Sequence, residues 1–154
     1  MPGWSLIVAL ASALFFAAGA QGQAAPERLP LEIEASGGSH RFMVELATTS
    51  EQRSRGLMFR REMGADEGML FDFDSEREVT MWMHNTYLPL DMVFIGADGR
   101  VKTVAERTTP LSDRIISSRV PVRFVLEINA GRAAEAGIRP GDRVSGAAIA
   151  PLLR

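Results

Sequence analysis

The sequence predicts a mainly β domain of the α+β class, a small antiparallel β-barrel or sandwich-like sheet with two short helices. Short apolar or alternating runs follow one another along the chain, separated by glycine, proline and aspartate turns, as in antiparallel strands. Helical signals are confined to two short segments, too few to alternate with strands in a βαβ design. With 154 residues, 46% hydrophobic and 23% charged, the chain has the size and composition of one globular domain.

The first 20 residues carry no charged side chain and contain an apolar run from Trp4 to Ala18. The run ends in Ala18-Gly19-Ala20, the small-residue pattern that precedes signal-peptide cleavage. It is short for a bilayer span, which needs about 20 residues. We therefore expect a signal peptide over 1–20, cleavage before Gln21 and a periplasmic or secreted protein. An uncleaved N-terminus is the one membrane contact we consider.

Charge and cysteine content exclude several classes of function. The net charge of -2 argues against a nucleic-acid partner, because neutralising phosphates requires a concentrated basic surface. The sequence has no cysteine, which removes disulfides, thiol nucleophiles and thiolate metal sites. We expect a monomer without a cofactor, whose partner is a small molecule or another component of the cell envelope.

The N-terminal half of the domain, predicted over 31–154, begins with a hairpin and a helix. Residues 21–30 have no periodicity and predict a linker, and strand-like runs at 31–34 and 42–46 flank a glycine turn. The spacing from Thr48 to Glu51 is that of a capping box, which predicts a short helix ending near Arg55. Gly56 then suits the left-handed position that ends helices, because it has no β-carbon.

The rest of the domain is predicted as six further strands, about eight in all, and a second helix. The strands are expected over 68–73, 79–83, 91–95, 101–104, 124–128 and from Arg143. An alanine-rich stretch over 131–136 predicts the second helix, stopped by Gly137. Residues 107–121 have no clear period and predict a long, arginine-rich loop, and loops of that length are often functional.

A set of short motifs carries a resemblance to a known family. In chain order they are Arg55-Gly56-Leu57-Met58-Phe59-Arg60, Gly68-Met69-Leu70-Phe71, Met81-Trp82-Met83, Asn85-Thr86, Pro89-Leu90-Asp91 and Leu126-Glu127 with Ala130-Gly131. In combination they resemble the family called domain of unknown function 192, over about residues 31 to 150. The resemblance implies a compact, mostly β fold and supplies no catalytic residue. Family members usually have lysine where this chain has His84.

Asp91 is the first candidate site residue. It shares a predicted strand face with Val93 and Ile95, which places a carboxylate among apolar side chains, where an unpaired charge is costly. Two interpretations stay open. In the structural one, Asp91 accepts backbone N–H bonds from the turn at 85–88 or pairs with Arg55.

In the functional interpretation, Asp91 converges with Asn85 and Thr86 on a small polar or glycan-like ligand. Polar groups in an apolar rim orient such ligands. Arg55 completes the group of candidate ligand-binding residues, and Trp82 supplies a flat apolar surface if it is exposed.

Two further constellations are weaker. Met81, Met83 and His84 have donor atoms that suit Cu(I), but alternation places the two methionines opposite the histidine, so we interpret the methionines as core residues and predict no metal site. Guanidinium groups bind carboxylate and phosphate, so the arginines of the long loop and its flank are candidate anion ligands, with a solvated loop as the alternative. These arginines are Arg107, Arg114, Arg119 and Arg123.

The inventory for catalysis is small, with His40 and His84 as the only histidines and no hydrolase or phosphate-binding motif. Asp91 and Glu127 could act as an acid and base pair, although alternation predicts that Glu127 faces solvent or a salt bridge. The leading hypothesis is a non-catalytic binding module of the cell envelope. An envelope hydrolase that uses Asp91 with a second carboxylate, and a structural or assembly partner, are the alternatives.

Overall fold

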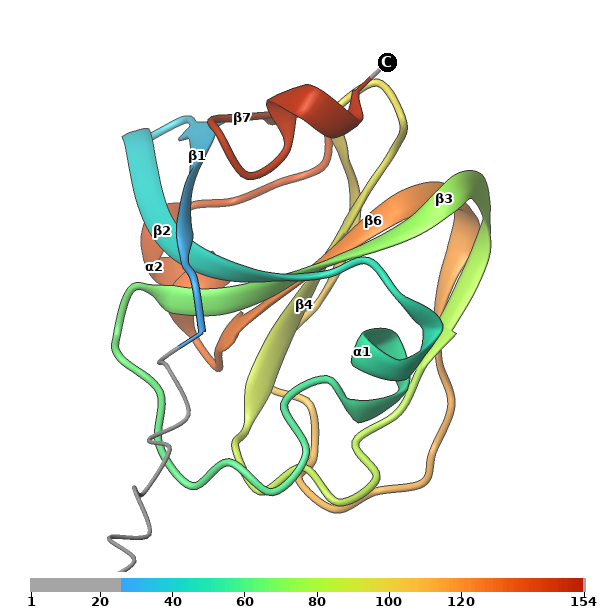
Figure 1. Ribbon diagram of the computed structural model, residues 1–154. Coiled ribbons are helices and arrows are strands. Elements are labelled where there is room, and N and C mark those ends of the chain that lie inside the picture. Colours follow the sequence, from blue (N-terminus) through green and yellow to red (C-terminus); the bar gives the residue numbers. More distant parts are fainter. Residues whose placement is uncertain (1–25, 154) are drawn as a thin grey trace, which may run out of the picture.

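The computed structural model describes residues 26–153, which form one curled seven-stranded sheet with strand order β5-β4-β6-β3-β2-β1-β7 (Figure 1). The strands are β1 (Leu29–Ala35), β2 (Gly38–Ala47), β3 (Glu67–Met81), β4 (Leu90–Ile95), β5 (Val101–Ala105), β6 (Ile116–Asn129) and β7 (Arg143–Ser145). The helices are α1 (Ser50–Arg55), α2 (Arg132–Ala136) and the 3-10 turn η1 (Ala150–Leu152). The predicted mainly β, barrel-like fold with two short helices is confirmed.

The first hairpin starts earlier than its sequence pattern predicts. Leu29 pairs with Val44 and Pro30 with Met43, so the last two residues of the predicted linker belong to β1. Pro30 can be part of β1 because it lies near the start of the strand, where the missing N–H of proline costs only one hydrogen bond between strands. The predicted signal peptide and residues 21–25 of the linker lie outside the described residues.

The predicted helix after β2 is present, with its capping box shifted by one residue. Thr49, not Thr48, is the N-cap, and its side chain accepts a bond from the backbone N–H of Gln52. The Gln52 side chain in turn accepts the backbone N–H of Thr49, so glutamine takes the place predicted for Glu51. The helix ends at Arg55. Gly56 has a positive φ of 48°, but its ψ of -134° lies outside the left-handed helical region that was predicted.

The pairing of β2 with β3 departs from the predicted antiparallel design. Glu45 lies opposite Met69 in a parallel ladder, and the chain between the two strands passes through α1. The exclusion of βαβ connections was therefore wrong for this one crossover. A single short helix followed by an extended loop is long enough to return the chain to the same end of the sheet, as parallel pairing requires.

Strands β3 and β6 are longer than predicted and cross the molecule side by side (Figure 1). The two strands predicted over 68–73 and 79–83 are one strand, which bends where the register shifts between Asp72 and Arg77. Its far half pairs with residues that were assigned to the long loop, including Met81 with Ile116. The loop is therefore confined to 106–115, because β-bulges let both strands continue through a bend.

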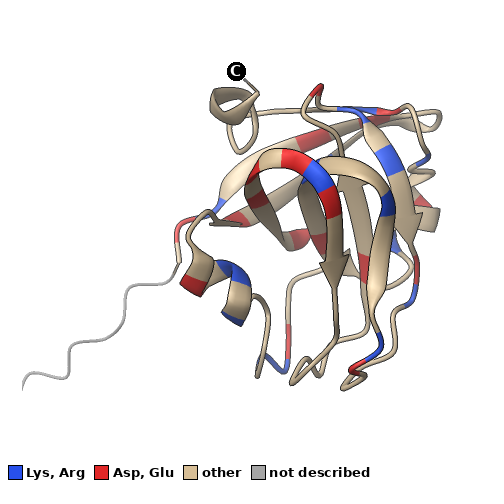
Figure 2. Ribbon diagram, turned by 90° about the vertical axis from the view of Figure 1, so that its right-hand side faces the viewer, with Lys and Arg blue, Asp and Glu red and all other residues tan. Residues whose placement is uncertain are grey.

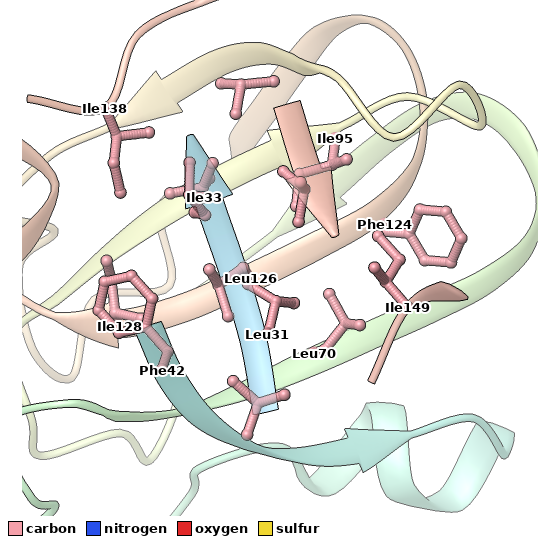
Figure 3. Packing of buried hydrophobic residues seen from close by; sticks show 14 of the residues in the cluster. Leu31, Ile33, Phe42, Leu70, Ile95, Phe124, Leu126, Ile128, Ile138 and Ile149 are labelled. Atoms are coloured by element: carbon pink, nitrogen blue, oxygen red, sulfur yellow. The ribbon is translucent and has the colours of Figure 1, made fainter. Parts of the chain in front are cut away.

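The sheet has a hydrophobic core on each face. The first is enclosed by the curl and holds Leu31, Phe42, Leu70 and Leu126 (Figure 3). The second lies on the opposite face and includes Phe71, between the sheet and the α1 segment with its following loop. At one end the edge strands meet, since Arg100 bridges Arg143 in antiparallel fashion. No helix within 26–153 is long and apolar enough to cross a bilayer.

Candidate functional site

Asp91 is completely buried and its carboxylate is held by backbone donors from distant segments. The backbone N–H of Arg107 donates to Oδ1 at 2.8 Å, and the N–H groups of Gly131 and Ala133 donate to Oδ2, each at 2.9 Å. Neither partner that the sequence suggested, the 85–88 turn or Arg55, makes these bonds. The carboxylate ties β4 to the end of β5 and the start of α2, with both oxygens occupied.

The proposed pairing of Asp91 with Glu127 is wrong. On the adjacent strands Asp91 lies opposite Ile128, whereas Glu127 lies opposite Met92. Directly opposed residues share a face of a sheet and successive residues alternate, so the two carboxyl groups point to opposite faces. They cannot act on one substrate bond, and the two-carboxylate hydrolase loses its geometric basis.

Glu127 is the buried acidic group at the second core. Its exposed fraction is 5%, and it stands in a row across three strands between Met69 and Met92. Among residues 26–153 no side chain or backbone group acts on its carboxyl group through a hydrogen bond or an ion pair, and burial is the only cause of its altered pKa. Burial without a counter-charge raises the pKa of Glu127 from its ordinary value of 4.5 to about 8. Near neutral pH it is mainly a carboxylic acid, able to donate a hydrogen bond.

The expectation that Glu127 faces solvent or a salt bridge was therefore wrong. Apolar–polar alternation shows which side chains face solvent only when one face of the sheet is exposed to solvent. Strand β6 is a central strand that is buried on both faces. The sequence did hold a signal. A glutamate interrupts the apolar run Phe124-Val125-Leu126-Glu127-Ile128, and continuous apolar runs indicate strands buried on both faces.

Glu127 opens into a narrow crevice of about 30 Å³ between the sheet, α1 and the segment after β3. Three of the five predicted ligand-binding residues line it: Arg55, Trp82 and Thr86. Gly56 forms part of the wall, where a β-carbon would come within 3.1 Å of the Phe71 ring. The crevice is therefore large enough to hold a water molecule.

Trp82 lines the crevice and stacks against His84. The rings stack with centroids 4.8 Å apart, and the indole side chain is 47% exposed. His84 Nδ1 lies 2.6 Å from Asp113 Oδ1, which fixes the imidazole. Met83, between them in sequence, is buried in the second core and Met81 packs against it, so the prediction that these methionines are core residues is confirmed.

Asn85 does not line the crevice, but its backbone connects two loops next to the crevice. Its φ is 50°, and its carbonyl accepts the backbone N–H of Phe59, which itself has a φ of 66°. The neighbouring Thr86 hydroxyl donates to the His84 carbonyl. Positive φ at residues other than glycine costs energy and occurs often where a site must be shaped.

The candidate anion-binding arginines divide into two groups. Arg123 makes a two-pronged ion pair with buried Asp72 beside the bend of β3, where acidic and basic residues alternate (Figure 2). Arg107, Arg114 and Arg119 line a larger cavity of about 560 Å³ beneath the 106–115 loop. The Arg107 guanidinium, however, lies over the backbone of Gly131.

In its described part the chain is a small, curled-sheet domain whose crevice holds the buried carboxyl group of Glu127. The chain belongs to the family described as "DUF192: Uncharacterized ACR, COG1430", whose family model matches residues 31–146. The family resemblance drawn from the sequence motifs is thereby confirmed.

Two solved structures of similar proteins share the fold. One is a protein from Sinorhizobium meliloti 1021, proposed to be a transcription regulator, with 48% sequence identity and a TM-score of 0.78 over 82% of this chain and 99% of that one. Another is a protein of unknown function from Novosphingobium aromaticivorans DSM 12444, with 38% identity and a TM-score of 0.76 over 93% and 99% of the two chains. No functionally curated protein matches.

Proposed function

We propose that this protein is an exported small-ligand-binding module of the cell envelope, which holds a polar or glycan-like ligand at the Glu127 crevice. One observation carries the proposal. Glu127 is a buried carboxyl group without a hydrogen-bond partner in the described part of the chain, and it lines the same crevice as Trp82, which is 47% exposed. Buried polar groups are normally satisfied, so a ligand hydroxyl is a reasonable partner.

The size of the crevice sets how the ligand binds. A volume of about 30 Å³ has room for a water molecule or a small polar group, so a small part of the ligand reaches Glu127. The body of the ligand lies outside, against the Trp82 face, where a sugar ring presents its apolar C–H surface. Arg55 and the oxygen of Thr86 stand at the rim as further polar contacts. This is the usual composition of a small-molecule site, mostly apolar with a few polar groups.

A second candidate function is docking to another envelope component. The loops at the crevice end expose a set of large apolar side chains, and exposed apolar patches often mark interaction sites. They are Phe59, Trp82, Tyr87, Leu111 and Ile115. Binding of a small ligand and docking through this end make different predictions, because only the first depends on Glu127.

The test uses the full chain carrying Trp4→Phe, in which Trp82 is the sole tryptophan. Titration with monosaccharides, disaccharides and polyols, followed by indole fluorescence, should give a saturable signal for at least one class. Glu127→Leu should weaken binding about tenfold or more, because a hydrogen bond to a buried polar group is lost. Glu127→Gln should keep part of the affinity, since the amide still donates.

Matched controls separate the site from its surroundings. Glu51→Gln alters an exposed carboxylate on α1 and should leave the titration unchanged. Phe59→Ala removes an exposed aromatic ring outside the crevice and should have little effect on ligand binding. A panel without any saturable response, or equal binding by Glu127→Leu and the parent, contradicts the proposal.

A further inference from the structure

We infer that the chain has a second ligand site, for an amphipathic organic anion, in the cavity beneath the 106–115 loop. The cavity has a volume of about 560 Å³ and lies between β5, this loop and the start of β6. That volume is in the range of ordinary small-molecule sites. It is distinct from the Glu127 crevice, because Trp82 lines the crevice whereas Met83, pointing the other way, lines the cavity.

The inner wall of the cavity is apolar. Phe94 and Met83 belong to the second core and are almost fully buried, yet both contribute to the lining. Ala105 and Ile116 extend this surface, and Ile115 stands exposed in the lining. A hydrocarbon or aromatic group entering the cavity would therefore leave water for an apolar surface, which is favourable.

The cavity also carries two cations without a carboxylate partner. Arg114 and Arg119 are exposed, and no acidic group in the described residues lies within 4.0 Å of either guanidinium. Glu106 is the only acidic residue in the lining, where it stands beside three arginines. Because the Arg107 guanidinium rests over Gly131, Arg114 and Arg119 are the two groups left to meet an anion.

The hydroxyl groups of the lining are mostly engaged with the protein itself. Ser117 donates to Glu78 and accepts the backbone N–H of Arg119, while Ser118 donates to the Val120 carbonyl. Thr103 and Thr108 likewise donate to backbone carbonyls. A neutral, hydroxyl-rich ligand therefore finds few free partners here, which favours recognition through charge.

The backbone around the cavity is held in an unfavourable conformation at three places. Arg107, Leu111 and Arg119 have φ values of 50°, 60° and 60°. L-residues rarely adopt this region, and such outliers gather at binding sites, where the surrounding structure maintains them. Two of these three residues, Arg107 and Arg119, are arginines that line the cavity, so the unusual backbone conformation occurs at charged residues of the site.

These features select one ligand chemistry: a carboxylate or phosphate head at Arg114 and Arg119, with an apolar body against Phe94 and Met83. Octanoate and octyl phosphate are suitable probes, because they share the anionic head and the alkyl chain. Isothermal titration of the full chain should show saturable binding of one or both. Acetate, inorganic phosphate and 1-octanol should each bind at least about tenfold more weakly, since each lacks the head or the body.

Variants test the assignment of the two arginines. The double variant Arg114→Gln, Arg119→Gln should lower the affinity for octanoate about tenfold or more, while thermal unfolding reports that the fold persists. Thr109→Trp, at an exposed position in the lining, should block entry. Arg139→Gln, in the turn before β7, removes an exposed arginine distant from the cavity and should leave binding unchanged.

Several results would overturn the inference. Equal affinities for octanoate and 1-octanol would mean that the negative charge does not contribute to binding. Equal affinities for acetate and octanoate would mean that the apolar wall does not contribute. Unchanged affinity in the double arginine variant removes the proposed anion contacts. Absence of binding by octanoate and octyl phosphate up to about 10 mM removes the site altogether.

Discussion

Asp91 and Glu127 are both buried acids on neighbouring strands, and their surroundings give them opposite properties. Asp91 accepts three backbone N–H bonds, whereas the carboxyl group of Glu127 receives none from the described residues. Burial without such bonds raises the pKa of Glu127. Asp91 therefore acts on the stability of the fold, and Glu127 is the residue available to a ligand.

Replacing Asp91 with asparagine should destabilise the protein. The amide keeps one acceptor oxygen but turns its NH2 group toward backbone donors, so at least one buried N–H loses its partner. We expect the free energy of unfolding to fall by about 1–3 kcal/mol, measured by thermal or urea denaturation at neutral pH. Asp113→Asn, at an exposed ion pair with His84, is the matched control and should change little. An unaffected Asp91→Asn variant would show that the three bonds add no stability.

Glu127 should make the stability of the protein depend on pH. Its pKa is about 8 in the folded state and near 4.5 when unfolded, so between these values the folded chain binds the extra proton. Stability is therefore greatest below pH 4.5 with respect to this group, falls as the pH rises to about 8 and is then constant. The whole change is on the order of 3–5 kcal/mol.

The measurement is urea denaturation of the parent and Glu127→Gln at several pH values from 4.5 to 9. Glutamine stays neutral, so the variant should lack this slope and gain stability relative to the parent as the pH rises. Comparing the two curves removes the contribution of other titrating groups. Parallel curves would mean that Glu127 keeps an ordinary pKa in the folded protein.

From the sequence, burial was predicted correctly for Asp91 and wrongly for Glu127, and the partners of Asp91 were not identified. Strand alternation correctly placed Asp91 on the face of Val93 and Ile95, both of which are buried. Its partners Gly131 and Ala133 come from a segment about forty residues away, and nothing local in the sequence encodes that approach. Arg55, Trp82 and Thr86 were identified through the family motifs, and the structure brings all three to one crevice.

At the scale of elements, the start of α1 offers a sharp comparison between two adjacent threonines. Thr49 caps the helix, whereas the Thr48 hydroxyl makes only a 3.4 Å contact with Gln52. Thr49→Ala should therefore lower the free energy of unfolding by about 1 kcal/mol, and Thr48→Ala by clearly less. Thermal unfolding of the two variants measures both. Equal losses would argue that the helix start is as the sequence pattern predicted, with Thr48 in the capping box.

Elements were predicted best where their signals are local. The helix stop at Gly56, the second helix and the β4 and β5 strands follow from short patterns that are complete within a few residues. The parallel pairing of β2 with β3 depends on where a nineteen-residue connection returns, and the far half of β6 depends on its partner in β3. The sequence of a single strand contains little information about which distant strand it pairs with.

At the scale of the whole molecule, the curl of the sheet brings its two edges together. Residues from 81 to 86 contribute to the lining of both the Glu127 crevice and the arginine-lined cavity. Edge strands expose unpaired backbone groups that invite association, and the contacts between Gly99–Val101 and Gly141–Val144 satisfy part of both edges. The Glu127 crevice and the arginine-lined cavity share no lining residue.

Export is the prediction that concerns the whole chain. Cleavage before Gln21 leaves β1 intact, because that strand begins at Leu29, so the mature protein keeps every strand of the sheet. Expression of the full chain in a Gram-negative bacterium should give a periplasmic protein whose N-terminal residue is Gln21, measured by fractionation and intact mass. Val8→Asp with Leu10→Asp interrupts the apolar run and should hold the uncleaved chain in the cytoplasm. A parent protein that keeps Met1 and stays in the cytoplasm contradicts export, and one that keeps Met1 in the membrane fraction identifies the apolar run as an anchor. Either result would move the proposed ligand out of the periplasm without altering the geometry of the Glu127 crevice.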